Sequence, residues 1–184
     1  MVYTFARPFV RLRVSPDVMT FLGLAVAGLA VWAAGAGWLW VAIVLIVVSG
    51  LLDNLDGAVA VLTDRVTPFG HVLDSSVDRI CDGLYLVALW LVGAPGLVCV
   101  GAGAGMGLVE YVRARAGAAG MSEVGVVTIF ERPTRVIVTA AFLLGAAIYP
   151  DHADGWATAG AWAWLGLSLV ALIQLVPVVR RRLR

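Results

Sequence analysis

Long apolar stretches separated by short polar segments run along most of the chain. A helix needs about 20 apolar residues to cross a bilayer, at about 1.5 Å of rise per residue. The first stretch opens with Ser15, Pro16 and Asp17, which is typical of a helix start with a capping hydroxyl and a first-turn proline. The pattern predicts an all-α integral membrane protein with six transmembrane helices, at about Asp17–Gly35, Trp38–Leu62, Pro68–Val92, Leu97–Ala116, Pro133–Ile148 and Trp156–Val179.

Composition agrees with a membrane protein. Of the 184 residues, 61% are hydrophobic and 14% are charged, whereas soluble domains lie nearer half apolar and a quarter charged. Residues 1–14 intersperse Phe5, Phe9 and Leu12 with arginines, which predicts an amphipathic helix lying at the membrane interface. We expect a single domain over residues 1–184, made of this interfacial helix and a six-helix bundle over 15–184. The net charge of +1 does not indicate a nucleic-acid partner, and none is expected.

The basic residues lie mainly at one set of helix ends, and all of them are arginine. The loops at the opposite ends contain none. Since arginine-rich segments face the cytoplasm, we expect a multi-pass protein of the inner membrane with both termini inside. The residues that carry this prediction are Arg7, Arg11, Arg13, Arg65, Arg113, Arg115, Arg132, Arg135, Arg180, Arg181, Arg182 and Arg184.

Four aspartates interrupt the apolar pattern near the cytoplasmic ends of the second and third predicted helices. Asp53 and Asp56 are three residues apart, and Asp74 and Asp78 are four apart, so each pair shares a helix face. A short turn joins the two helices, so the pairs are expected to face one another. A carboxylate inside a bilayer costs about 2.5–3.5 kcal/mol on insertion scales, and gathered carboxylates repel one another. A functional reason for the cluster is therefore expected.

A bound metal ion usually offsets the repulsion between carboxylates in such a cluster. Ligands that are all oxygen favour Mg²⁺, Mn²⁺ or Ca²⁺ over zinc or copper. Mg²⁺ is commonly shared between carboxylates and substrate phosphates, so we expect Mg²⁺ or Mn²⁺, in a pair of ions, and a pyrophosphate-bearing substrate. Gly57, Ala60 and Gly70 would let a planar base and phosphates approach the backbone. Close packing of the helices is the alternative explanation for these small residues.

The spacing resembles the signature of the CDP-alcohol phosphotransferase (CDP-alcohol phosphatidyltransferase) family. The resemblance implies a homodimeric six-helix membrane enzyme that transfers the phosphatidyl group of CDP-diacylglycerol to an acceptor hydroxyl and releases CMP. It also implies that the four aspartates hold the metal on the cytoplasmic side and that Asp78 is the catalytic general base. The pattern D-x-x-D-G-x-x-A, nine residues, G-x-x-x-D-x-x-x-D is formed here by Asp53, Asp56, Gly57, Ala60, Gly70, Asp74 and Asp78.

One position departs from the family pattern. The family has an arginine directly after the alanine, thought to hold the phosphates, and this chain has Val61. Arg65 lies one turn further on and Arg79 follows Asp78, so either arginine is a candidate to compensate. We therefore expect CDP to be bound by Asp56, Gly57, Ala60, Arg65, Gly70 and Asp74.

The stretch EYVRARAGAAGMSEVGVVTIFERPTR resembles the actinobacterial phosphatidylinositol-phosphate synthases. In that group a similar segment lines a pocket for the acceptor's phosphate, which implies that Arg113, Arg115, Arg132 and Arg135 bind a phosphorylated polyol, most simply inositol phosphate. These arginines would alternatively be topology anchors at the membrane surface. The group also has an arginine near the end of its last helix, soon after an Ile-Gln pair; this chain has the pair, Ile173 and Gln174, but continues with Leu175.

Other functions stay open from the sequence. Glycerol 3-phosphate or another alcohol is an alternative acceptor for the same chemistry. A degenerate family member would bind a CDP-lipid without turning it over. A cation transporter would also explain intramembrane carboxylates, but it does not predict the fixed spacing of Gly57, Ala60 and Gly70.

Overall fold

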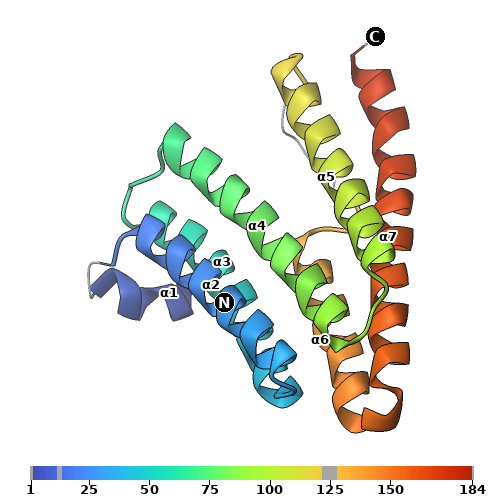
Figure 1. Cartoon of the computed structure of the whole chain (residues 1–184). Coiled ribbons are helices and arrows are strands. Elements are labelled where there is room, and N and C mark those ends of the chain that lie inside the picture. Colours follow the sequence, from blue (N-terminus) through green and yellow to red (C-terminus); the bar gives the residue numbers. More distant parts are fainter. Residues whose placement is uncertain (1, 12–13, 122–127, 184) are drawn as a thin grey trace. The chain divides into compact units, whose positions relative to one another are not determined.

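The computed structural model describes residues 2–11, 14–121 and 128–183, and these are helical apart from short connections, with no strand among them. The predicted all-α class is confirmed, and each of the six predicted segments coincides with a helix. The elements are α1 (Val2–Arg11), α2 (Pro16–Gly35), α3 (Leu39–Leu62), α4 (Pro68–Val92), α5 (Gly96–Ala118), α6 (Arg132–Ile148), the 3₁₀ turn η1 (Pro150–His152) and α7 (Ala153–Arg182) (Figure 1).

Four helical stretches among the described residues are long and apolar enough to cross a membrane. They are α2, α3, α5 and the continuous stretch Pro150–Arg182, which joins η1 and α7. The chain is thus an integral membrane protein. The remaining two long helices differ for identifiable reasons: α4 carries four charged residues, Asp74, Asp78, Arg79 and Asp82, and α6 has only 17 residues.

The chain forms two compact units, residues 1–88 and 89–184. In the first unit α2 and α3 pack against each other, and α1 packs on α3. Met19, Leu52 and Val59 form the centre of a buried apolar cluster. Phe9 and Val10 of α1 pack on it, so the N-terminal segment is helical and held to the unit.

A chain of buried hydrogen bonds joins α4, α3 and α2 inside the first unit. The Tyr85 hydroxyl donates to Ser49 Oγ at 3.0 Å, and the Ser49 hydroxyl donates to the carbonyl oxygen of Gly23 at 2.9 Å. Tyr85 and Ser49 are fully buried. Because hydrocarbon offers no hydrogen bonds, such groups must find partners within the protein. These hydrogen bonds link α3 and α4, which carry the four predicted aspartates, to each other and to α2.

In the second unit α7 packs against both α5 and α6. Trp164 of α7 is fully buried, and its indole N–H donates to Thr139 Oγ1 of α6 at 3.0 Å. Its ring meets Phe130 edge to face, with ring centroids 5.1 Å apart. Phe130 lies just before α6, so these contacts fix the start of the helix that carries two of the predicted arginines, Arg132 and Arg135.

Candidate active site

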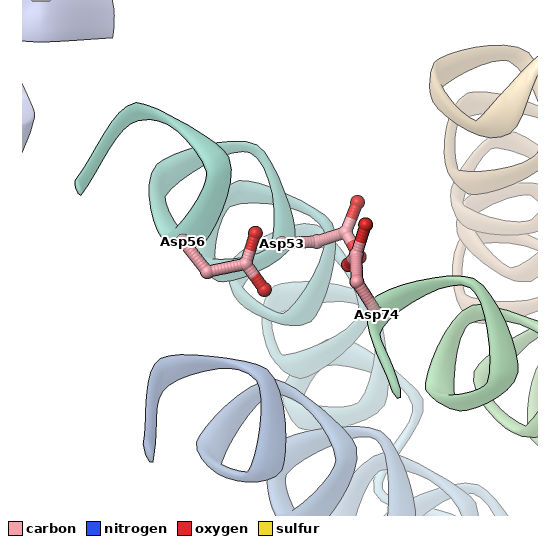
Figure 2. A group of neighbouring side chains, drawn as sticks. All are labelled: Asp53, Asp56 and Asp74. Atoms are coloured by element: carbon pink, nitrogen blue, oxygen red, sulfur yellow. The ribbon is translucent and has the colours of Figure 1, made fainter. Parts of the chain in front are cut away.

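Three of the four predicted metal ligands come together in the first unit. Asp53 and Asp56 project from α3 and Asp74 from α4, and one oxygen of each carboxylate lies within 4.8 Å of the others (Figure 2). Asp56 is buried and the other two are half-buried. Three carboxylate oxygens at this separation fit a hard divalent cation in both chemistry and charge.

Asp78, the fourth predicted ligand, lies outside that group of three. Its Oδ2 is 3.4 Å from Nη2 of the neighbouring Arg79. Arg79 Nε is in turn 3.4 Å from Oδ2 of Asp82, which is fully buried. Arg79 therefore lies between two carboxylates of its own helix. The assignment of Asp78 as ligand and general base stays a prediction.

A cavity of about 220 Å³ adjoins the group of three carboxylates, and Asp56 and Asp74 of that group line it. It is formed by the first turns of α2, the last turns of α3, the α3–α4 connection and the first turns of α4. All six residues predicted to bind CDP contribute to it. The lining residues are Pro16, Asp17, Thr20, Asp56, Gly57, Ala60, Val61, Arg65, Val66, Thr67, Gly70, His71 and Asp74.

The turn between α3 and α4 explains why Arg65 lines this cavity. Asp64 adopts a left-handed conformation, with φ of 55°. The Arg65 N–H donates to the Ala60 carbonyl at 2.9 Å and the Asp64 N–H to the Val61 carbonyl at 3.3 Å, which is a Schellman ending of α3. This ending reverses the chain, so that Arg65 faces the same cavity as Val61.

Thr67 and Gly70 form the start of α4 at the cavity. The Gly70 N–H donates to Thr67 Oγ1 at 2.9 Å, so the threonine hydroxyl caps the helix. A Cβ atom at position 70 would lie 3.0 Å from that hydroxyl oxygen. A larger side chain at position 70 would thus crowd the capping hydroxyl and take space from the cavity.

Two cavity residues, Asp17 and Thr20, were not among the predicted site residues. The Thr20 hydroxyl donates to Oδ2 of Asp56 at 2.6 Å, and both side chains are buried. The sequence pattern marks Asp17 only as an early acid of a helix start. The signal that would have identified both residues is the packing of α2 against α3, which their spacing in the sequence does not reveal.

The predicted acceptor-phosphate arginines lie in the second unit, and two of them are bound to glutamates. Arg113 makes a two-pronged contact with Glu131, with Nη1–Oε2 of 3.0 Å and Nη2–Oε1 of 2.7 Å. Arg135 is almost fully buried; its Nη2 lies 2.5 Å from Glu110 Oε1. Its Nε–H donates to the Phe130 carbonyl at 3.1 Å. These contacts hold both guanidinium groups in place.

The other two predicted arginines have different surroundings. Arg132 is buried at the first turn of α6, and Arg115 is exposed near the end of α5. Gln174 belongs to the Ile-Gln pair after which the resemblance implies an arginine, and its side-chain oxygen accepts a hydrogen bond from the Ile129 N–H at 3.0 Å. Gln174 therefore ties α7 to the segment before α6.

Glu131 has a perturbed pKa. Burial alone would raise the pKa of this carboxyl group, but the hydrogen bonds from Arg113 and from the Thr128 N–H and hydroxyl outweigh burial and lower it from 4.5 to about 2. A carboxyl group whose pKa is lower in the folded state adds stability above its unfolded pKa. That contribution is lost as the pH falls from about 4.5 towards 2.

We accordingly predict an acid-sensitive contribution from Glu131. In detergent, the melting temperature of the native chain should exceed that of Glu131→Gln at pH 6, because the ionised carboxylate pairs with Arg113. The difference should narrow as the pH is lowered to 3. A difference in melting temperature of equal size at both pH values would show that the carboxylate charge contributes nothing to stability. Thermal unfolding of the two proteins across this pH range makes the measurement.

The family model described as CDP-alcohol phosphatidyltransferase matches residues 13–173. An archaetidylinositol phosphate synthase from Aeropyrum pernix is 36% identical over 155 residues, which cover 77% of this chain and 79% of that protein. A phosphatidylinositol phosphate synthase from Mycolicibacterium smegmatis is 32% identical over 189 residues, which cover 95% and 82% of the two chains.

Solved structures give the same assignment. The crystal structure of Mycobacterium tuberculosis phosphatidylinositol phosphate synthase with CDP-DAG bound matches with a TM-score of 0.77 at 27% identity, covering 97% of this chain and 93% of that chain. The same enzyme in complex with manganese and citrate matches with a TM-score of 0.78 at 27% identity, covering 98% and 89%. With the family model matching most of its length, the chain belongs to the CDP-alcohol phosphatidyltransferase family and is a transferase of that class.

Proposed function

We propose that this enzyme transfers the phosphatidyl group of CDP-diacylglycerol to a hydroxyl of inositol phosphate and releases CMP. The observation that carries the proposal is the cavity lined by all of the predicted nucleotide residues, two of which, Asp56 and Asp74, belong to the group of three converging carboxylates. The choice of acceptor is supported by the relatives, because the archaeal proteins are named archaetidylinositol phosphate synthase and the bacterial ones phosphatidylinositol phosphate synthase.

The lipid donor has a second candidate. The Aeropyrum and Methanothermobacter relatives are named archaetidylinositol phosphate synthases, at 36% and 35% identity. The mycobacterial structure holds CDP-DAG. We favour the diacylglycerol donor, and a CDP-activated archaetidyl donor is the alternative. The archaeal and bacterial names differ in the lipid part and share inositol phosphate. The lipid donor is therefore the part of the proposal that most needs a direct test.

In the proposed reaction, Asp78 accepts the proton of the acceptor hydroxyl, whose oxygen attacks the phosphorus atom on the lipid side. The bond from that phosphorus to the bridging oxygen breaks, and the bridging oxygen leaves with CMP. Asp53, Asp56 and Asp74 would hold a divalent cation, which would supply charge stabilisation for the diphosphate. Gly57, Ala60 and Gly70 leave room for the nucleotide; Arg65 offers a guanidinium to its phosphates.

Several further features belong to the proposal. Two Mg²⁺ or Mn²⁺ ions serve the site, and the manganese complex of the mycobacterial enzyme supports a divalent metal. Residues 1–184 form one family domain, which works as a homodimer. Both α4 and α6 also cross the membrane, α1 lies at its cytoplasmic interface, and both termini and the active site are cytoplasmic. Arg113, Arg115, Arg132 and Arg135 bind the acceptor's phosphate.

The proposal is tested by measuring CMP release from the purified protein in detergent. CDP-diacylglycerol and CDP-archaeol are each supplied with inositol phosphate, with glycerol 3-phosphate or with no acceptor, in Mg²⁺, in Mn²⁺ or in EDTA. We expect release with CDP-diacylglycerol and inositol phosphate, and none in EDTA. CMP release only with glycerol 3-phosphate would overturn the assignment of inositol phosphate as the acceptor. Nucleotide binding without release under every condition would indicate a degenerate family member.

A further inference from the structure

The buried hydroxyl of Thr20 makes a short contact with one of the three gathered carboxylates, that of Asp56. Its oxygen lies 2.6 Å from Asp56 Oδ2 and 3.2 Å from the carbonyl oxygen of Pro16 in its own helix. A hydroxyl has one proton and so donates fully to one acceptor at a time. The shorter distance and the charge of a carboxylate both favour Asp56, because hydrogen bonds to ionised acceptors are the stronger ones.

With this contact, both oxygens of Asp56 are held by donors. The Gly57 N–H donates to Oδ1 at 2.6 Å, and Thr20 donates to Oδ2. One donor belongs to the backbone of α3 and the other to α2, so rotation of the carboxylate would break at least one hydrogen bond. Each carboxylate oxygen has two lone pairs, so both oxygens keep capacity to bind a cation.

Helix α2 offers Thr20 from a fixed position. Gly23, about one turn further along α2, accepts the hydrogen bond from Ser49, which in turn accepts one from Tyr85. Met19, directly before Thr20, is fully buried in the apolar cluster with Leu52 and Val59. The hydroxyl is therefore held relative to α3 by contacts on both sides of it along the helix.

We propose that Thr20 is a positioning residue that orients the Asp56 carboxylate for binding of the divalent cation. Groups that hold metal ligands in place typically contribute 10–100-fold to metal affinity or activity. The inference rests on the proposed function insofar as that function places a cation at Asp53, Asp56 and Asp74. It adds a residue of α2 to a site whose predicted ligands all come from α3 and α4.

The test measures Mn²⁺ affinity in the substrate-free protein, from the electron paramagnetic resonance signal of free Mn²⁺. Thr20→Val keeps the shape of the side chain and removes the hydroxyl, and we expect Mn²⁺ to bind about 10–100-fold more weakly. Thr20→Ser keeps the hydroxyl and should stay near the native affinity. Thr20→Ala differs from Thr20→Ser only in the hydroxyl, so this pair repeats the comparison if the valine variant does not fold.

Thr63→Val is the matched control, because the Thr63 hydroxyl donates to the Val59 carbonyl of its own helix at 2.7 Å and Thr63 does not line the cavity. Its Mn²⁺ affinity should equal that of the native chain. In turnover assays, Thr20→Val should need more Mn²⁺ for half-maximal CMP release and should recover most of its kcat at saturating Mn²⁺. If Thr20→Val lost activity only because its fold was damaged, added Mn²⁺ would not restore CMP release.

The outcomes separate this inference from the proposed function. Native-like Mn²⁺ affinity in folded Thr20→Val, or equal affinities in the serine and alanine variants, overturns the role of Thr20 and leaves the proposed function standing. A native chain that does not bind Mn²⁺ overturns both the metal site and the inference. CMP release with an unexpected acceptor contradicts the proposed function alone, since the Mn²⁺ titration contains no substrate.

Discussion

Asp74→Asn is expected to reduce metal-dependent CMP release by roughly 10³-fold, the largest effect of any single substitution considered. Asp74 is the α4 member of the group of three carboxylates, and the substitution replaces an anionic ligand by a neutral amide of the same shape. Metal ions contribute several kcal/mol of charge stabilisation, and each 1.36 kcal/mol corresponds to about tenfold in rate. The measurement is the initial rate of CMP release at saturating substrates, together with Mn²⁺ affinity.

Asp151→Asn provides the matched control for this prediction. Asp151 is exposed in η1, and the same Asp-to-Asn change there should leave the rate within about twofold, as expected of a surface substitution. Folding of both variants is compared by thermal unfolding in EDTA. If Asp74→Asn folds and retains a rate near that of the native chain, the carboxylate group is not the metal centre.

Arg65→Ala is expected to lower kcat/KM for the CDP-lipid by about 10–100-fold, mostly through a higher KM. The cavity exposes the carboxylates of Asp17, Asp56 and Asp74, and a diphosphate brings further negative charge to it. Among its lining residues, Arg65 and His71 are the basic side chains, and only Arg65 carries a fixed charge. A hydrogen bond to a charged group contributes about 1.5–3 kcal/mol, which sets the size of the expected loss.

Val61 provides the complementary test. It lines the same cavity one turn before Arg65, and 58% of its surface is exposed, so a longer side chain there can extend without displacing the core. In the Arg65→Ala background, Val61→Arg should recover at least part of the lost affinity. Arg181→Ala, at the exposed end of α7, is the control for loss of an arginine. An Arg65→Ala variant with unchanged KM would assign the phosphate-binding role to other residues.

The helices were predictable because their boundaries are set locally. The bounds of α4 match the predicted Pro68–Val92, since a proline starts the helix and Gly93, with φ of 126°, ends it. The apolar pattern underestimated α7, which continues through Arg180, Arg181 and Arg182. An apolar pattern marks the part of a helix that suits hydrocarbon, whereas the helix itself continues for as long as its backbone hydrogen bonds do.

Contacts between helices were less predictable than the helices themselves. Motif spacing alone was enough to predict that Asp53, Asp56 and Asp74 gather, because a short turn joins their two helices. The contact of Thr20 with Asp56 joins residues 36 positions apart, and the pairing of Arg113 with Glu131 joins residues 18 apart across a longer connection. Neither pairing has a local signal, since each depends on which helix faces packs together.

The hydrogen-bond chain from Tyr85 through Ser49 to Gly23 also bears on how the protein is assembled during synthesis. Tyr85 of α4 and Ser49 of α3 each bring a hydroxyl that needs a partner away from water, and Gly23 of α2 brings a carbonyl oxygen, so both hydroxyls donate only once the three helices have packed. The ligand-bearing segments then meet in the same event that satisfies these hydroxyls. The packing that satisfies the hydroxyls of Tyr85 and Ser49 is thus the same packing that brings Asp53, Asp56 and Asp74 together.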